Sequence, residues 1–488
     1  MSKIMVPVFE NLIEATLAIG DDGSGTLQAQ LHAHLRSAIL NGSLAAGTKL
    51  PSSRAFAQQQ GVSRNTILAA YDQLIAEGYL ETRRGAGTYV SYDLPDDFIK
   101  TGKGANQSID RSPKAIKSGE QRQRPTGLPA MDAFPMDIWA RINSSAWRRA
   151  DPQLLRHTDV MGYPPLREAI AAYLASARNV QASAEQIIIT SGLQQGMTLI
   201  ADSLMTASNT IILEDPGYGG LLRTAQACTP QITYVPVDKS GACVPETTQK
   251  NNLLVVSPSH QYPLGITMPT SRRLELIKWA RATSSLILED DYDSEFRYEG
   301  RPLNSLQGMS NGEHVIYGGT FSKTIFPALR LGYLVLPPHL VEPIQARREA
   351  TDSFPSIMPQ LALTKFISEG YFARHIRRLR KIHAARQANF ICCFKKQLSL
   401  YFILVPSPAG LDMVAYPTDK LKTSRLKTDV EWANMAHSAG LAALPLSGAY
   451  RTIIPEEGLL LGFANSRSKE ISEALKKLAQ IMRSESGF

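Results

Sequence analysis

Apolar residues recur at helical spacing within the first hundred residues and predict a small mixed domain there. The predicted elements are a helix ending at Asn41-Gly42, a helix starting after Pro51 and ending at Gly61, a helix capped by Ser63, and strands at 78–82 and 88–90. The two strands are joined by a basic turn. Two helices joined by a short turn and followed by a hairpin predict a winged helix-turn-helix.

A different pattern begins near residue 129, where helical stretches alternate with short, continuous apolar runs. The runs cover 187–190, 210–213, 253–256, 286–288 and 334–336. Such runs are typical of strands buried on both faces of a mainly parallel sheet. The chain is therefore expected to be multi-domain, with a large α/β domain after the winged helix.

Composition separates these two parts. Lys, Ser, Gly, Gln and Pro dominate from Lys100 to Pro125, and few large apolar residues occur there. Such a stretch buries too little surface to fold and predicts a flexible tether. The expected boundaries are 24–91 for the winged helix, 92–128 for the tether and 129–488 for the large domain.

Charge and cysteine content narrow the classes of function. The 488 residues carry a net charge of +8, with a pI near 9.2, which permits a polyanionic partner without requiring one. The four cysteines form no CxxC pair and have no histidine cluster near them, so reduced thiols and no metal site are expected. No apolar run reaches the length of a membrane span. These features favour a cytoplasmic protein.

The third predicted helix carries the chemistry of a DNA reader. Arg64, Asn65 and Thr66 follow the Ser63 cap, and a recognition helix places such first-turn residues against base edges. On the wing, Arg83 and Arg84 could grip phosphates or the minor groove. A winged helix that contacts protein instead of DNA is the alternative.

The stretch from 50 to 90 resembles the DNA-binding domain of GntR-family transcription regulators along its whole length. That resemblance implies that residues contacting double-stranded operator DNA or shaping the wing are Ser52, Ser53, Arg54, Ser63, Arg64, Asn65, Thr66, Arg84, Gly85 and Gly87.

A single lysine in the large domain stands out. Lys323 lies between Ser322 and Thr324, and it follows a turn of small residues that includes Thr320. A lysine amine is nucleophilic only when deprotonated, which nearby positive charge such as Arg330 promotes. Thr320, Ser322 and Arg330 are also suitable donors for a phosphate ester. An amine beside a phosphate-binding set indicates a pyridoxal phosphate Schiff-base site; a surface lysine in a polar loop is the alternative.

Four polar motifs follow the first four apolar runs, at 191–196, 214–218, 259–265 and 289–293. Ligands of such sheets bind where strands end, so these motifs are expected near one site. The first offers backbone N–H groups to a phosphate. In the second, Tyr218 could stack on a planar ring. In the fourth, a carboxylate could pair with a pyridine nitrogen and a tyrosine could reach the ring oxygen.

The order and spacing of these motifs resemble fold-type-I aminotransferases over about residues 130–470. The resemblance implies a large α/β domain with a small C-terminal α+β subdomain, Lys323 as the Schiff-base lysine, Asp290 at the pyridine nitrogen and Tyr292 at the ring hydroxyl. The other residues expected around pyridoxal phosphate are Ser191, Gly192, Leu193, Tyr218, Tyr262, Thr320, Ser322 and Arg330.

Reader, tether and aminotransferase-like domain together resemble the MocR-type subfamily of GntR regulators. In that group the aminotransferase fold works mainly as a ligand sensor. The resemblance implies a homodimer and a response to pyridoxal phosphate or to an amine or amino acid.

Three positions depart from the aminotransferase pattern. Tyr262 stands where an asparagine is usual, His157 where a tyrosine is usual, and Leu460 where an arginine holds the substrate carboxylate. A leucine cannot form the bidentate carboxylate pair, although Arg451 in the preceding loop could substitute. We therefore expect a DNA-binding regulator with little or no aminotransferase turnover; the alternative is a working aminotransferase with a vestigial DNA-binding head.

Overall fold

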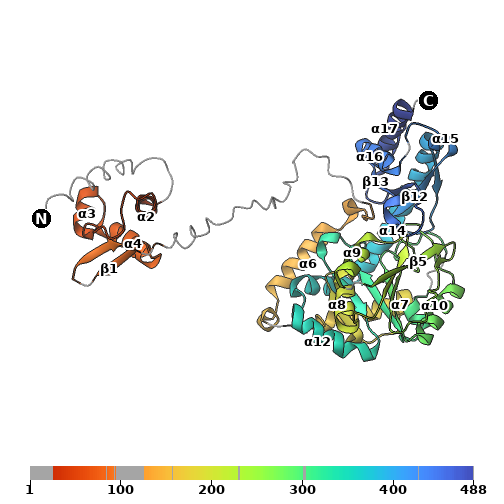
Figure 1. The fold of residues 1–488 in the computed structure, drawn as a ribbon, viewed down its shortest axis with the longest axis horizontal. Coiled ribbons are helices and arrows are strands. Elements are labelled where there is room, and N and C mark those ends of the chain that lie inside the picture. The colour runs from red at the N-terminus through yellow and green to blue at the C-terminus, as the bar shows by residue number, and fades with distance from the viewer. Residues whose placement is uncertain are drawn as a thin grey trace. The chain divides into compact units, whose positions relative to one another are not determined.

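The chain divides into two units, Met1–Glu120 and Gln121–Phe488 (Figure 1). The computed structural model describes residues 26–83, 85–92, 94, 126–156, 158–228, 231–300, 304–426 and 428–486. We call the described part of the first unit the reader unit and that of the second the large unit. Most of the predicted tether, together with Arg84 and His157, lies outside the described residues.

The reader unit has the elements that the sequence predicts. They are α2 (Leu27–Leu40), α3 (Ser53–Gln60), α4 (Arg64–Ala76), β1 (Leu80–Arg83) and β2 (Gly87–Val90). Asn41 caps α2, Gly61 ends α3 in the left-handed region at φ +65°, and Ser63 caps α4. The strands pair antiparallel with Leu80 opposite Val90. One apolar cluster, to which all three helices and both strands contribute, holds this winged helix together.

A single eight-stranded sheet forms the centre of the large unit. In spatial order its strands are β3 (Ile187–Thr190), β10 (Gly332–Val335), β9 (Val315–Thr320), β8 (Leu286–Asp291), β7 (Leu253–Val256), β4 (Ile211–Asp215), β5 (Ile232–Asp238) and β6 (Gly241–Ala242). The strands from β9 to β5 are parallel. The apolar run at 334–336 contributes to β10, which is antiparallel to both neighbours. The sheet is thus mixed, because only a short connection without a crossover helix separates β9 from β10.

Helices cover both faces of this sheet (Figure 1). They are α6 (Met136–Arg148), α7 (Pro164–Arg178), α8 (Leu193–Leu204), α9 (Gly219–Cys228), α10 (Thr270–Ala282), α11 (Leu306–Met309), α12 (Val341–Thr351), α13 (Ile357–Ser368) and α14 (Tyr371–Leu398). Ile187 and Ile189 pack in the cluster with α6, α7 and α13, whereas Ile188 packs in the cluster with α8, α9 and α12. All three isoleucines are fully buried, which explains the continuous apolar runs in the sequence.

The chain after α14 forms a small α+β subdomain. Its elements are β11 (Phe402–Val405), β12 (Asp412–Pro417), α15 (Asp419–Lys422), α16 (Asp429–Ala439), β13 (Ala442–Pro445), β14 (Leu459–Gly462) and α17 (Ser468–Ser486). The four strands are antiparallel in the order β11-β12-β14-β13. They pack with α14, α16 and α17 in a separate core.

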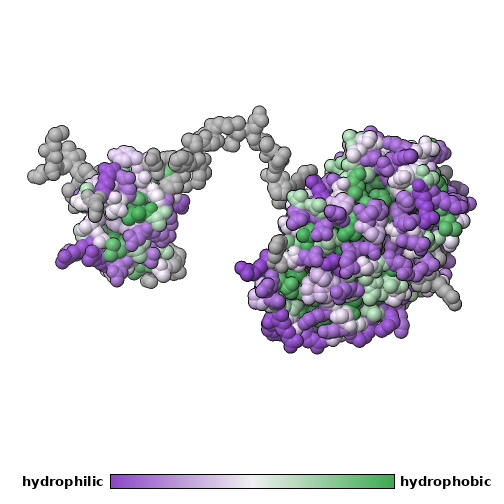
Figure 2. All heavy atoms as spheres, turned by 90° about the horizontal axis from the view of Figure 1, so that it is seen from below, coloured by the Kyte–Doolittle hydropathy of each residue, from purple (hydrophilic) through white to green (hydrophobic). Residues whose placement is uncertain are grey.

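The surface in view in Figure 2 is dominated by hydrophilic residues on both units, with small interspersed apolar groups. Within the described ranges, every helix is too short or too polar to cross a membrane.

Candidate DNA-reading surface and cofactor site

The predicted DNA-binding residues gather where two helices begin. Ser52 caps α3 by accepting a hydrogen bond from Ala55 N at 3.2 Å, and Ser63 caps α4 by accepting from Thr66 N at 3.1 Å. Arg64 Nε donates to Ser53 Oγ at 3.4 Å and so links the two helix starts. The side chains of Ser52, Arg54, Ser63, Arg64 and Asn65 are exposed. The structure therefore presents two helix N-termini and an arginine on one small surface, which suits phosphate and base contacts.

The wing is shaped by glycine and partly occupied by its own contacts. Gly85 and Gly87 have φ of +76° and +113°, a region that favours glycine. Arg83 donates to Glu81 at 2.6 Å, and its guanidinium lies 4.6 Å from the centre of the Tyr89 ring. Arg83 therefore has contacts within the wing, at an exposed position.

In the large unit, strand register aligns the predicted phosphate-binding segments. Gly332 in β10 lies opposite Thr190 of β3 on one side and opposite Thr320 of β9 on the other. The loop after Thr190 therefore lies beside the turn after Thr320. A Cβ built on Gly332 would lie 3.0 Å from the Cα of Gly192, so glycine at 332 permits this close approach.

Gly192 is the N-cap of α8, and no side chain caps that helix. The first N–H groups of α8 are consequently available to an anion. A Cβ on Gly192 would lie 3.8 Å from Arg330 Nη2, which places the exposed Arg330 side chain over this helix start. Thr320 Oγ1 and Ser322 Oγ lie 3.1 Å apart in the same turn. These donors have the chemistry that a phosphate requires.

Lys323 lies partly buried at the edge of this site. Its Nζ donates a hydrogen bond to the carbonyl oxygen of Gly127 at 2.8 Å. The N–H of Gly127 donates to Asp412 Oδ1 at 2.8 Å. Gly127 therefore connects the lysine to a carboxylate of the small subdomain.

Asp290 lies near the end of β8, where it faces the lysine. Burial, followed by the charges of Asp291 and Asp293, raises the pKa of Asp290 to about 8, while Lys323 acts in the opposite direction. The Asp290 side chain is only 8% exposed, and within the described residues its carboxylate makes no hydrogen bond. A buried carboxyl of this kind is suited to a ligand that brings its own N–H donor.

Three tyrosines from different motifs are in ring contact with one another. The rings of Tyr218 and Tyr262 meet edge to face at 5.5 Å, and Tyr262 and Tyr292 do so at 6.5 Å. Tyr218 is 46% exposed and therefore accessible to a planar ligand. The Tyr292 hydroxyl lies 3.0 Å from Nδ1 of His260, which also lies 2.9 Å from Asp293.

His260 contacts three side chains of this region through its ring nitrogens: those of Tyr292, Asp293 and Ser407. Burial lowers the pKa of His260, but Asp293 more than compensates, and the net shift is upward. Its Nε2 lies 3.2 Å from Ser407 Oγ in the connection between β11 and β12, which joins the strand ends to the small subdomain.

The place expected for a carboxylate-binding arginine is apolar. Leu460 is 3% exposed and belongs to a small cluster with Val414, Leu446, Tyr450 and Tyr262. Leucine at position 460, in place of the expected arginine, is therefore packed within an apolar cluster.

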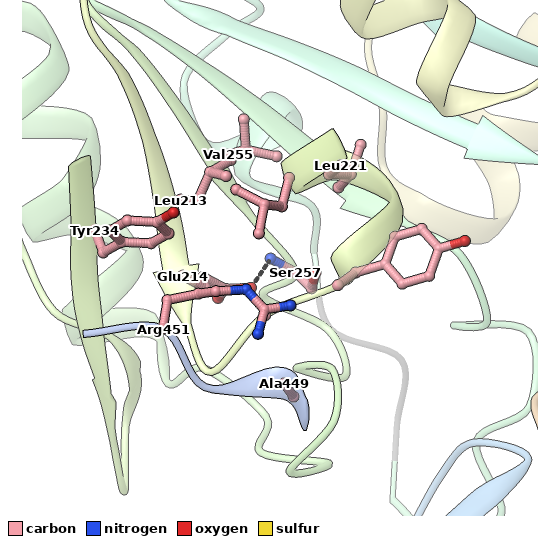
Figure 3. Close-up of a pocket in the computed structure, with 11 residues that line it drawn as sticks. Leu213, Glu214, Leu221, Tyr234, Val255, Ser257, Ala449 and Arg451 are labelled. Atoms are coloured by element: carbon pink, nitrogen blue, oxygen red, sulfur yellow. Dashed lines mark hydrogen bonds between the residues drawn. The ribbon is translucent and has the colours of Figure 1, made fainter. Parts of the chain in front are cut away.

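Arg451, the possible substitute, takes part in a different pocket. Its Nη1 donates to Gly448 O at 2.7 Å and to Tyr450 O at 2.6 Å. Arg451 lines a pocket together with Glu214, Ser257 and Tyr218 (Figure 3), and the lining of this pocket includes neither Leu460 nor Lys323. Burial raises the pKa of Glu214 to about 8.

The loop that carries Arg451 is fastened to the large sheet by Asp215. The fully buried Asp215 carboxylate accepts hydrogen bonds from the backbone N–H groups of Arg451, Thr452 and Ile453 at 2.8, 2.7 and 3.3 Å. It also accepts from Thr452 Oγ1 at 2.6 Å. This cluster of hydrogen bonds, which we call the Asp215 clasp, joins the end of β4 to the small subdomain.

Sequence reasoning missed three residues of this site: Gly127, His260 and Asp412. The sequence pattern places Gly127 in the tether, and it indicates His260 only as part of the motif at 259–265. Asp412 begins β12 next to an apolar run, where a carboxylate is unusual; that was the available signal.

Comparison with known proteins identifies both parts. The family described as bacterial regulatory proteins, gntR family, matches residues 27–90, and the family aminotransferase class I and II matches residues 130–478. The fold resembles a multiple substrate aminotransferase from Thermococcus profundus, with a TM-score of 0.67 and 21% identity over 80% of this chain and 99% of that chain. It also resembles kynurenine aminotransferase from Pyrococcus horikoshii, solved with PMP, with a TM-score of 0.65 and 24% identity over 74% of this chain and 90% of that one.

Two transcriptional regulators match most of the chain. The probable rhizopine catabolism regulatory protein MocR of Rhizobium meliloti is 36% identical over 474 residues, which is 95% of each protein. The pyridoxine biosynthesis transcriptional regulator PdxR of Corynebacterium glutamicum is 33% identical over 77% of this chain and 81% of its own length. The chain therefore belongs to the MocR-type subfamily of GntR-family regulators, in which a winged-helix DNA-binding domain is joined to a domain of the class I and II aminotransferase fold.

Proposed function

We propose that this regulator holds pyridoxal phosphate covalently at Lys323, through a Schiff base, and that its binding to operator DNA responds to pyridoxal phosphate or to an amino compound reacting there. We further propose that it works as a cytoplasmic homodimer, the arrangement implied by its resemblance to fold-type-I enzymes. The proposal extends the family assignment to a particular residue and a particular signal.

The residues of the site fit this cofactor. Asp290 is a buried carboxyl without a hydrogen bond in the described residues, as a pyridinium nitrogen requires. Gly192, Arg330 and the uncapped start of α8 suit its phosphate, and Tyr218 is accessible to its ring. When bound, pyridoxal phosphate supplies an electrophilic carbon that captures primary amines.

The observation that carries the proposal is the hydrogen bond from Lys323 Nζ to the carbonyl of Gly127 at 2.8 Å. A lysine nitrogen engaged in a Schiff base retains at most one hydrogen, whereas a free ammonium has three. Covalent use of Nζ therefore competes with its contact to Gly127.

Gly127 lies where the predicted tether enters the large unit. The contact of Gly127 with Lys323 is therefore linked through the tether to the winged helix. The residues that follow are also anchored: Ala130 N donates to His383 Nε2 at 3.0 Å, and Asp132 pairs with Arg386 at 2.7 Å. The state of Lys323 thus acts on a fixed segment leading to the DNA-binding domain. A ligand shifts such a system only by its different affinity for the two arrangements.

A working aminotransferase with a vestigial DNA-binding head is the rival function. It is disfavoured by the buried apolar cluster around Leu460 and by the exposed, well-capped helix start at Ser63 and Arg64. The first removes a substrate contact, and the second retains a DNA contact.

The test uses the full-length protein. Borohydride reduction with pyridoxal phosphate should fix one cofactor per chain on the peptide containing Lys323, as shown by mass spectrometry. Gel shifts with operator DNA, with and without the cofactor, should then differ in apparent affinity. A well-folded protein labelled at another lysine, or not labelled, would overturn the proposal.

A further inference from the structure

Among the described residues, the cluster around Leu460, where a substrate's carboxylate would be received, contains no positively charged side chain. The Leu460 cluster consists of Val414, Leu446, Tyr450 and Leu460, with Tyr262, Leu264 and Tyr416 packed against it. A carboxylate placed against this apolar surface would lose hydration without gaining an ionic partner. Arg451 does not change this, because its guanidinium is held by two carbonyls at another pocket.

The same end of the site carries a negative charge close to the reactive amine. A Cβ built on Gly127 would lie 2.9 Å from Lys323 Nζ and 3.4 Å from Asp412 Oδ2, so both groups face the same point. Asp412 Oδ1 is engaged by Gly127 N at 2.8 Å, whereas Oδ2 makes no hydrogen bond within the described residues. A ligand captured at Lys323 therefore meets an acceptor within a few bonds of its nitrogen.

We propose that the effector is a primary amine that has no carboxylate next to its nitrogen and carries a second hydrogen-bond donor, a hydroxyl or an ammonium group, which Asp412 binds. This inference rests on the proposed function and specifies the class of ligand. Asp412 selects among amines in two ways, because it attracts a hydrogen-bond donor and repels a carboxylate. The Leu460 cluster offers that carboxylate no alternative partner.

The capture step is balanced without a further reactant. With the Schiff base protonated before and after the exchange, the neutral ligand nitrogen would form a double bond to the carbon held by Lys323, the double bond from that carbon to Nζ would break, and one proton would pass from the ligand nitrogen to Nζ. Lys323 is thereby returned as a free amine, which again can donate to Gly127.

The experiment compares four small amines on the cofactor-loaded wild type: ethanolamine, 1,4-diaminobutane, propylamine and L-alanine. The readout is the change in cofactor absorbance as each amine displaces Lys323, and a gel shift with operator DNA at saturating amine. We expect ethanolamine and diaminobutane to saturate at concentrations about tenfold or more below propylamine, and L-alanine to be the weakest.

Asp412→Asn tests the residue itself, because it preserves size and removes the charge. Asp419→Asn, on the exposed neighbouring α15, is the matched control. Asp412→Asn should weaken the two donor-bearing amines about tenfold to a hundredfold, leave propylamine nearly unchanged and strengthen L-alanine. The control should behave as the wild type does.

The outcomes separate this inference from the proposed function. If borohydride fixes no cofactor at Lys323, both are overturned. If the cofactor is fixed but L-alanine saturates as readily as ethanolamine, or if Asp412→Asn shifts all four amines equally, the cofactor role stands and the ligand class is wrong.

Discussion

The reader unit and the large unit present their polar groups in opposite ways. In the reader, Ser63 to Thr66 are consecutive residues at one exposed helix start. In the large unit, Lys323 contacts Gly127, which lies 196 positions before it in the chain. Gly127 in turn contacts Asp412, and these two residues are separated by 285 positions. A surface made from local sequence can act without the rest of the molecule, whereas a site made from distant segments reports on how those segments are arranged.

This contrast predicts that the two activities can be removed separately. Loss of a reader side chain should leave the cofactor site intact, and loss of a cofactor contact should leave intrinsic DNA affinity intact. The following variants test whether the two activities are separable, in order of decreasing expected effect.

Lys323→Ala should abolish borohydride fixation of the cofactor, because the nitrogen that forms the Schiff base is gone. DNA affinity without cofactor should stay near that of the wild type, and its response to cofactor should disappear. Peptide mass spectrometry and gel shifts measure the two effects. Lys396→Ala, an exposed position on α14, is the control and should retain full labelling.

Arg330→Gln should weaken pyridoxal phosphate by about tenfold to a hundredfold, because a charged hydrogen-bond donor to the phosphate contributes about 1.5–3 kcal/mol. Pyridoxal, which lacks the phosphate, should bind the variant and the wild type alike. Absorbance titrations with both compounds check this. Equal losses for the two compounds would place Arg330 outside the phosphate site, and Arg281→Gln on α10 controls for a general charge effect.

Arg64→Ala should cost about 1–3 kcal/mol of binding on the preferred operator and much less on scrambled DNA, because it removes a base-edge contact. Arg54→Ala, at the neighbouring helix start, should weaken both DNAs more evenly. Gel shifts at fixed salt measure the four affinities. Cofactor fixation at Lys323 should be unchanged in both variants; a change there would show that the units are not separable in this way.

Asp290→Asn should alter how the stability of the cofactor-free protein depends on pH. The folded-state pKa of about 8 lies above the ordinary value for Asp, so its stabilising contribution is full below about pH 4 and is lost as pH rises through about 8. Wild type should therefore lose thermal stability between about pH 4 and 8 relative to the variant, by on the order of a few degrees. Melting curves across this range decide, and a constant difference would contradict the shifted pKa.

The sequence predicts the reader almost completely because its signals are local. The caps at Ser52 and Ser63 and the glycine at 61 fix the helix limits, and two short strands pair as expected. The contact of Arg83 with Glu81, two residues away on the same face of the strand, is a relation that strand alternation makes visible in the sequence.

In the large unit, the strand ends were predictable but their neighbours were not. The apolar runs correctly indicate buried strands, and register then brings the loop after Thr190 beside Thr320. No local pattern indicates that β10 is antiparallel, or that Gly127 and Asp412 approach Lys323, because these contacts depend on how the small subdomain packs.

The Asp215 clasp closes a ring of chain that runs from the end of β4 to the loop before β14. To separate the loop from the end of β4, all four hydrogen bonds to the buried Asp215 carboxylate must break. In a hydrogen-exchange experiment the amides of Arg451 and Thr452 should therefore be protected far beyond neighbouring exposed loop residues, and should exchange as slowly as the strand that holds them. The small subdomain is thus joined to the sheet at two separate points, by the Asp215 clasp and by the contact of Asp412 with Gly127.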